Sequence, residues 1–281
     1  MLNLGNWNEL TIVRFTDHGA YLDGGELGEI LMPKAYVRRE MKPGTVVRVF
    51  VYLDQSERLV GTTETPLATV GQFACLRVAW VNQYGAFLHW GVMKDLFVPF
   101  SEQRAKMEQG RAYVVYVHID EATRRIVGSA KTDRWLTPAP RHDYFRGKEV
   151  DLLVSGRSPL GLKVIVDNAH AGLIYADQIF GPEPHLGDRL KGTVVTVRPD
   201  GKLDISLGSI GKSRFRDFAD VLLEALQAAG GSLPYSDNSS PEEIADRFGV
   251  SKKTFKRALG TLYRAGRVSL QEHETKLVKG G

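Results

Sequence analysis

The residues best suited to bind a ligand are two aromatic side chains beside a glycine. Tyr84 precedes Gly85 and Phe87 follows it by two positions, in a segment whose alternation predicts a strand. Exposed rings on a strand can stack on flat π systems such as nucleobases. Alternating aromatic residues in a short strand more often belong to a core, so the pattern alone leaves ligand binding and packing open.

The sequence contains no recognisable motif for catalysis or metal binding. The seven histidines are scattered without metal-ligand spacing, and the single cysteine, Cys75, can form no internal disulfide. The glycine-rich stretch 24–29 follows a strand but opens no helix, so it does not predict a phosphate-binding loop. We therefore expect no cofactor, no metal and no enzyme. A nuclease or nuclease subunit stays an alternative, because side chains could meet across domains.

Composition and charge place the chain among globular proteins. Its 281 residues are 43% hydrophobic and 25% charged. The net charge is +4, and residues 212–281 contain 12 Lys and Arg against 9 Asp and Glu, which is most of the excess. The N-terminus lacks the features of a signal peptide, and no apolar run reaches the roughly 18 residues of a membrane span. We expect a cytoplasmic protein with no membrane partner.

One pattern of strands occurs three times along the chain. Residues 11–33 align with residues 76–99, so that Tyr21 matches Phe87. Each copy continues into a glycine turn, a long alternating strand and a short strand after an Asp-initiated turn. A third, fainter copy occupies residues 150–207. Short, evenly spaced strands with glycine at the bends predict small closed barrels of five strands.

We accordingly predict a mainly β fold of three tandem barrels followed by one α+β domain. The predicted domains are residues 1–66, 72–136, 146–211 and 213–281. The segments 63–72 and 132–147 are predicted to be linkers between the barrels.

Three helices and a strand pair are predicted in the last domain. The first helix has apolar residues at helical spacing, namely Phe215, Phe218, Val221, Leu222 and Leu226. Ser240, Pro241 and Glu243 form a capping box at the start of the second helix, and Ser251 caps the third. Two short strands follow Gly266. This order is typical of a winged helix-turn-helix.

Basic residues gather on the third predicted helix. Lys253, Arg257 and Arg264 lie opposite its apolar face, and Lys256 lies at the flank. Between Ser251 and Arg267 there are six basic residues and no acidic one. A solvated basic face is the ordinary explanation, but this imbalance favours contact with nucleic acid.

Each barrel resembles the S1 RNA-binding domain, a five-stranded OB-fold. The resemblance rests on the order strand, G-A-aromatic, strand ending "GEILMP" or "KDLFVP", glycine turn, long strand and "R-hydrophobic-V-G". Three such barrels with the C-terminal block are similar to the conserved virulence factor B family of bacterial RNA-binding regulators. The resemblance covers nearly the whole chain.

The resemblance implies which side chains contact RNA. The family's stacking positions correspond to Tyr84, Phe87 and Phe97 in the second barrel, to His18, Tyr21 and Leu31 in the first, and to Leu160, Lys163 and Tyr175 in the third. Its Asp-turn-Arg pair corresponds to Asp54 with Arg58, Asp120 with Arg125, and Asp200 with Lys202. We expect the second barrel to bind best, because all three of its positions are aromatic. We assign Trp80 and Trp90 to core or rim packing.

The predicted function is binding of single-stranded RNA without catalysis, in post-transcriptional regulation or as an adaptor to RNA-processing machinery. Aromatic side chains on the barrels would stack bases, and basic side chains would hold phosphates. The first alternative is a DNA-binding transcription factor that acts through the winged helix.

Overall fold

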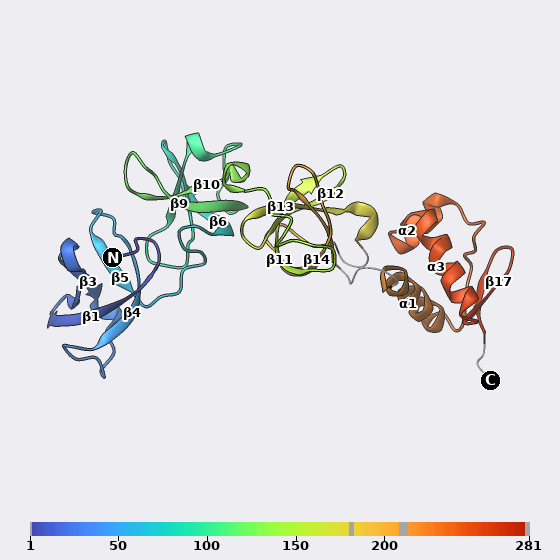
Figure 1. The fold of residues 1–281 in the computed structure, drawn as a ribbon, viewed down its shortest axis with the longest axis horizontal. Coiled ribbons are helices and arrows are strands. Elements are labelled where there is room, and N and C mark those ends of the chain that lie inside the picture. Colours follow the sequence, from blue (N-terminus) through green and yellow to red (C-terminus); the bar gives the residue numbers. More distant parts are fainter. Residues whose placement is uncertain (1, 180–182, 208–212, 279–281) are drawn as a thin grey trace. The chain divides into compact units, whose positions relative to one another are not determined.

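The computed structural model describes residues 2–179, 183–207 and 213–278, without the side chains of residues 213–217. The chain divides into two compact units, residues 1–135 and 136–281. Figure 1 shows two small barrels in the first unit, and a barrel and a helical domain in the second. The predicted fold class of three five-stranded barrels and a C-terminal winged helix is confirmed. In the described part of the chain, no helix is long and apolar enough to cross a membrane.

The two barrels of the first unit share one topology. The first barrel consists of β1 (Trp7–Thr16), β2 (Gly19–Asp23), β3 (Glu29–Pro33), β4 (Val46–Leu53) and β5 (Leu59–Thr62). The second consists of β6 (Phe73–Val81), β7 (Gly85–Leu88), β8 (Leu96–Pro99), β9 (Ala112–Ile119) and β10 (Ile126–Ser129). The third strand pairs in parallel with the fifth in both, and this pairing closes the barrel.

The third barrel repeats this order in the second unit. Its strands are β11 (Glu149–Ser158), β12 (Gly161–Val166), β13 (His170–Tyr175), β14 (Arg189–Val197) and β15 (Leu203–Ser206). The strands close in the order β11-β12-β13-β15-β14, around a core that includes Val164, Ile174 and Ile205.

Each second strand begins at a glycine because the next strand passes too close for a side chain. A Cβ atom added at Gly19 would lie 2.1 Å from Met32 O, and one added at Gly161 would lie 2.0 Å from Ile174 O. Both glycines also have φ near +145°, where other residues are strained. Gly85 meets Val98 O at 2.3 Å in the same way. The glycine that the sequence predicts at each barrel corner is thus required for steric reasons.

A β-bulge interrupts the first strand of every barrel at the same place. The register with the second strand shifts between Ile12 and Arg14, between Val78 and Trp80, and between Val154 and Gly156. The extra residue reverses the inward and outward alternation of the strand beyond it. The bulge therefore decides which side chains reach the outer face.

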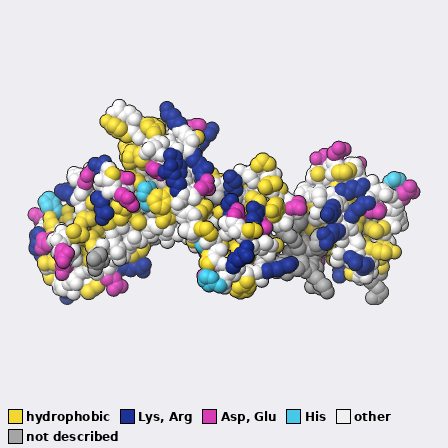
Figure 2. All heavy atoms as spheres, turned by 45° about the horizontal axis from the view of Figure 1, so that its top comes forward, with side chains coloured by type: hydrophobic (Ala, Val, Ile, Leu, Met, Phe, Trp, Pro, Cys, Tyr) yellow, Lys and Arg dark blue, Asp and Glu magenta, His cyan; other side chains and the backbone are white. Residues whose placement is uncertain are grey.

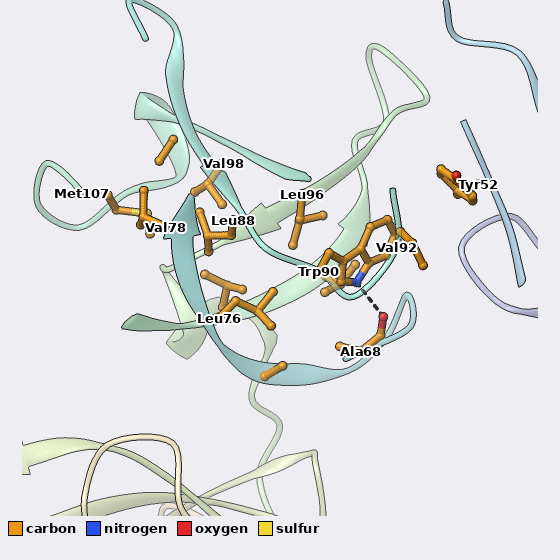
Figure 3. Packing of buried hydrophobic residues seen from close by; sticks show 14 of the residues in the cluster. Tyr52, Ala68, Leu76, Val78, Leu88, Trp90, Val92, Leu96, Val98 and Met107 are labelled. Carbon is orange, nitrogen blue, oxygen red and sulfur yellow. Dashed lines mark hydrogen bonds between the residues drawn. The ribbon is translucent and has the colours of Figure 1, made fainter. Parts of the chain in front are cut away.

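The first two barrels pack against each other through a shared hydrophobic core. Trp90 is only 2% exposed and meets Phe50 edge to face, with ring centroids 5.3 Å apart. Its Nε1 donates to Ala68 O at 2.7 Å, as Figure 3 shows. Ala68 belongs to the segment predicted to be a linker, and it is buried in this core. The segment is therefore part of the interface, and Trp90 is a core residue, as predicted.

The segment 132–147, predicted to be the second linker, is also largely packed. It begins with a short 3-10 helix, Thr132–Trp135, whose Trp135 ring stacks on Tyr116 at 4.5 Å. Further on, Ala139 and Tyr144 are buried in the core of the third barrel. Tyr144 also donates to Asp167 Oδ2 at 2.9 Å.

The C-terminal domain contains α1 (Ser213–Ala228), β16 (Ser232–Leu233), α2 (Pro241–Phe248), α3 (Lys252–Arg264), β17 (Val268–Leu270) and β18 (Thr275–Leu277). The capping box of Ser240 and Glu243 is formed, and Ser251 caps α3. Strand β16, which the sequence did not predict, pairs with β18 and completes a three-stranded sheet. The side chain of Phe215 lies outside the described residues.

Candidate nucleic-acid interface

Three aromatic rings lie next to one another across the outer face of the second barrel. Phe87 of β7 pairs with Trp80 of β6 on one side and with Phe97 of β8 on the other. The Trp80 and Phe87 rings are parallel, with centroids 3.7 Å apart and planes inclined by 4°. Phe87 and Phe97 lie 4.9 Å apart with a tilt of 36°. The three strands thus hold a continuous aromatic layer.

Trp80 belongs to this layer, so of the two positions predicted for it, core or rim, the structure excludes the core. Strict alternation from buried Val78 would point Trp80 inward, but the bulge at Ala79 turns it to the outer face. Its side chain is 43% exposed, and its Nε1 donates to Asp95 Oδ2 at 3.0 Å. Phe87 is half-buried between Trp80 and Phe97, so it supports the layer from within.

Tyr84 is the most exposed aromatic residue of the predicted set. It is 65% exposed, in the turn that precedes β7. The Asn82 carboxamide accepts a hydrogen bond from the backbone N–H of Tyr84 at 2.8 Å, and this Asx-type contact fixes the turn. The ring is therefore presented to solvent from a held backbone.

In the first barrel a guanidinium takes the place of the indole. Arg14 pairs with Tyr21, and its Cζ lies 4.0 Å from the centroid of the Tyr21 ring. Glu29 accepts from Arg14 Nη2 at 2.6 Å and holds the group in place. Side-chain hydrogen bonding to Glu29 raises the pKa of Arg14. His18, the other predicted residue, is exposed in the turn before Gly19.

The third barrel departs from both arrangements. Lys163 is exposed and pairs with Gly156 and Leu173, so no ring lies beside it. The position assigned to Tyr175 needs correction, because Leu173 occupies the register of Phe97 and Tyr175 lies opposite Gly161. The Tyr175 hydroxyl accepts from Arg198 Nη2 at 3.0 Å. Leu160 is exposed in the turn.

The three Asp-turn pairs differ from one another. Asp54 accepts from Arg58 Nη2 at 2.7 Å, and Lys202 Nζ lies 3.0 Å from Asp200 Oδ2. In the second barrel the carboxylate of Asp120 instead accepts hydrogen bonds from Thr123. The three carboxylates are therefore held in different ways.

All three of these carboxylates have lowered pKa values, and for Asp200 the main cause is the side-chain hydrogen bond from Lys202. Burial tends to raise the pKa of Asp54, but hydrogen bonds from Arg58 and Ser56 outweigh it and lower the pKa. Hydrogen bonds from Thr123 lower the pKa of Asp120. The three groups are therefore charged near neutral pH, where they fix the turns but repel phosphates.

The outer face of α3 is strongly basic. Lys253, Lys256, Arg257 and Arg264 are all exposed, as the sequence predicted, while Phe255 is buried. A shallow hollow on this face is lined by Lys256, Arg257, Gly260, Thr261, Tyr263 and Arg264. Figure 2 shows Lys and Arg side chains gathered on the visible face of this domain, at the right of the view. Such a face can hold phosphates.

Among the described residues, no group of three or more His, Cys, Asp or Glu side chains could hold a metal ion.

Two family models match the chain. Residues 4–64 match the S1 domain, and residues 220–277 match the CvfB-like winged helix domain. A relative called conserved virulence factor B, from Staphylococcus haemolyticus, is 24% identical over 86% of this chain and 83% of its own length. The resemblance to the conserved virulence factor B family is confirmed. The S1 and winged helix domains indicate nucleic acid binding, and domains of these kinds are generally not catalytic.

Two further proteins align over similar lengths of this chain. The Bacillus subtilis protein YitL is 29% identical over 92% of this chain and 88% of its own length. A crystal structure of a multidomain protein with nucleic acid binding domains, from Streptococcus pneumoniae, is 25% identical. It aligns over 98% of both chains with a TM-score of 0.44.

Proposed function

We propose that the protein binds single-stranded RNA without cleaving it, as a post-transcriptional regulator or as an adaptor to RNA-processing machinery. The observation that carries the proposal is the exposed aromatic layer of the second barrel, with Tyr84 in the adjoining turn. Stacking on such rings is available only to bases that are not paired in a duplex. The basic face of α3 would add contacts to phosphates.

The test compares three labelled ligands of one sequence at fixed salt, namely single-stranded RNA, single-stranded DNA and duplex DNA. Fluorescence anisotropy of the full chain should give the lowest Kd for single-stranded RNA. Tighter binding to duplex DNA than to either single strand would contradict the proposal. Incubation of the labelled RNA with divalent metal should leave it intact. Cleavage that copurifies with the protein and is lost on mutation of one carboxylate would favour the nuclease alternative.

The transcription-factor alternative is supported by the basic face of α3, but the residues of this helix fit it poorly. Residues 252–264 contain no Asn or Gln, which are the side chains that pair bidentately with adenine. Gly260 presents no side chain on the outer face. Lys and Arg at these positions suit phosphate contacts, which carry little sequence information.

A further inference from the structure

The same three-part arrangement occurs at the same register in the first two barrels. In each, a planar side chain from the first strand covers a ring on the second strand. Trp80 covers Phe87 at 3.7 Å, and Arg14 covers Tyr21 at 4.0 Å. We call Trp80 and Arg14 the planar caps. Both follow the β-bulge directly, so the bulge is what brings them to the outer face.

A carboxylate from the third strand region orients each planar cap. Asp95, two residues before Phe97, accepts from Trp80 Nε1 at 3.0 Å. Glu29, two residues before Leu31, accepts from Arg14 at 2.6 to 3.1 Å. Each contact lies in the plane of the cap, since N–H groups of an indole or a guanidinium point along the plane. The carboxylates therefore leave one flat face of each cap uncovered by this bond.

Barrel geometry does not require this arrangement. In the third barrel the corresponding first-strand residue is Gly156, and it pairs with Lys163. The position two residues before Leu173 is Ala171, which has no carboxylate. The third barrel closes without a cap, a ring or a carboxylate at these positions. The planar caps are therefore explained more simply by a role in binding a ligand than by a role in forming the barrel.

We infer that the planar caps Trp80 and Arg14 are the surfaces on which unpaired nucleobases stack, and that Phe87 and Tyr21 support them from below. This inference rests on the proposed function. Phe87 lies between Trp80 and Phe97, and Trp80 is the most exposed ring of the three at 43%, so it is the ring that an incoming base reaches most readily. Indole and guanidinium groups are both planar and both stack on bases.

The charges around the planar caps favour bases over phosphates. Asp95 places a carboxylate beside the indole, and a carboxylate repels a phosphate that approaches the same edge. The charge of Arg14 is largely offset by Glu29 in a bidentate ion pair. Arg14 is thus held as a stacking plane more than as a phosphate contact. The salt dependence of binding should therefore change little when Arg14 is replaced.

The test uses the full chain and a short fluorescein-labelled single-stranded RNA of mixed sequence. Trp80→Ala should raise Kd roughly 5- to 150-fold, the range expected for loss of one stacked base. Trp80→Phe should recover most of the affinity because it keeps a flat ring. Arg14→Ala should also raise Kd, and Arg14→Lys should not restore it, since lysine keeps the charge but loses the plane. Urea unfolding curves show whether each variant is folded.

Three further variants, at Phe145 and at Asp95, test whether the effect depends on where the ring lies and how it is oriented. Phe145→Ala removes a ring that is 61% exposed and belongs to residues 136–281, and it should leave Kd unchanged. Asp95→Asn keeps an oxygen acceptor for Trp80 Nε1, so it should bind RNA more tightly than Asp95→Ala, which releases the ring. Equal Kd values for these two Asp95 variants would contradict the orienting role of the carboxylate.

Three results are distinguishable. If the wild-type chain binds no single-stranded RNA, the proposed function fails. If the wild type binds and Trp80→Ala has the same Kd, the bases do not stack on Trp80 and the inference fails alone. If Trp80→Ala binds more tightly than the wild type, Trp80 is a lid that a base must displace from Phe87, which also overturns the inference.

Discussion

Arg125 of the second barrel forms an ion pair with Glu57 of the first barrel. Arg125 follows the turn after β9, and Glu57 lies in the turn between β4 and β5. Nearby, Lys94 Nζ donates to Asp54 O at 2.8 Å, and burial lowers the pKa of Lys94. The turn arginine that the family resemblance assigned to RNA is therefore engaged between the two barrels.

We predict that Arg125→Ala changes RNA affinity little. Both partners of the ion pair are about half exposed, so its loss should cost at most about 1 kcal/mol of stability. Fluorescence anisotropy and urea unfolding measure the two effects. Glu57→Ala is the matched control, because it breaks the same pair and leaves the arginine in place. A large rise in Kd for Arg125→Ala, without one for Glu57→Ala, would show that Arg125 contacts RNA and would contradict this prediction.

Phe87→Ala should weaken RNA binding by about 1–3 kcal/mol, because Trp80 loses the ring that supports it. The effect should not add to that of Trp80→Ala, since both changes remove the same stack. A double-mutant cycle on Kd tests this. Fully additive losses would show that the two rings contact the ligand independently. Tyr21→Ala should cost less than Phe87→Ala, because Leu31 stands in the first barrel where Phe97 stands in the second.

Replacing Lys253, Arg257 and Arg264 together by Ala should lower RNA affinity and flatten the dependence of log affinity on log salt. The change in slope should reach up to about three phosphate equivalents if all three side chains contact phosphates. The measurement is Kd at several salt concentrations. A triple variant that keeps its RNA affinity and loses tight binding to one duplex DNA sequence would favour the transcription-factor alternative.

Gly260→Ala should stabilise the protein yet weaken nucleic acid binding. A Cβ atom at Gly260 would meet no atom within 4 Å, and alanine in a helix interior is favoured over glycine by about 0.5–1 kcal/mol. The fold therefore gains nothing from this glycine, and its place in the basic hollow points to close approach of a ligand. Urea unfolding and anisotropy test both halves. Higher stability with unchanged Kd would show that Gly260 is not part of the binding surface.

The features that sequence reasoning predicted correctly are those that depend on local chemistry. The corner glycines, the capping box at Ser240 and the basic face of α3 can each be recognised within a few neighbouring residues. Because the strand pattern repeats along the chain, recognising it in one barrel predicts the other two. These local signals were enough to predict the fold class.

The features that sequence reasoning missed depend on strand register or on partners that are distant in the sequence. Trp80 follows a bulge, and an alternating pattern counted from Val78 cannot show the extra residue. The family resemblance places a stacking position at Tyr175, whereas the pairing of β12 with β13 places Leu173 opposite Lys163. Arg125 takes its partner from another barrel, which no local motif reveals.

The most direct test of RNA binding on the second barrel is photocrosslinking of the full chain to single-stranded RNA that contains 4-thiouridine, with the crosslinked peptides identified by mass spectrometry. A base that stacks on an aromatic ring lies within reach of a crosslink to it. We predict crosslinked peptides from the segment β6 to β8, with crosslinks at Trp80 and Tyr84. In the Trp80→Ala variant the crosslink at position 80 should be lost. Crosslinks confined to residues 213–281, with none in the second barrel, would contradict the account.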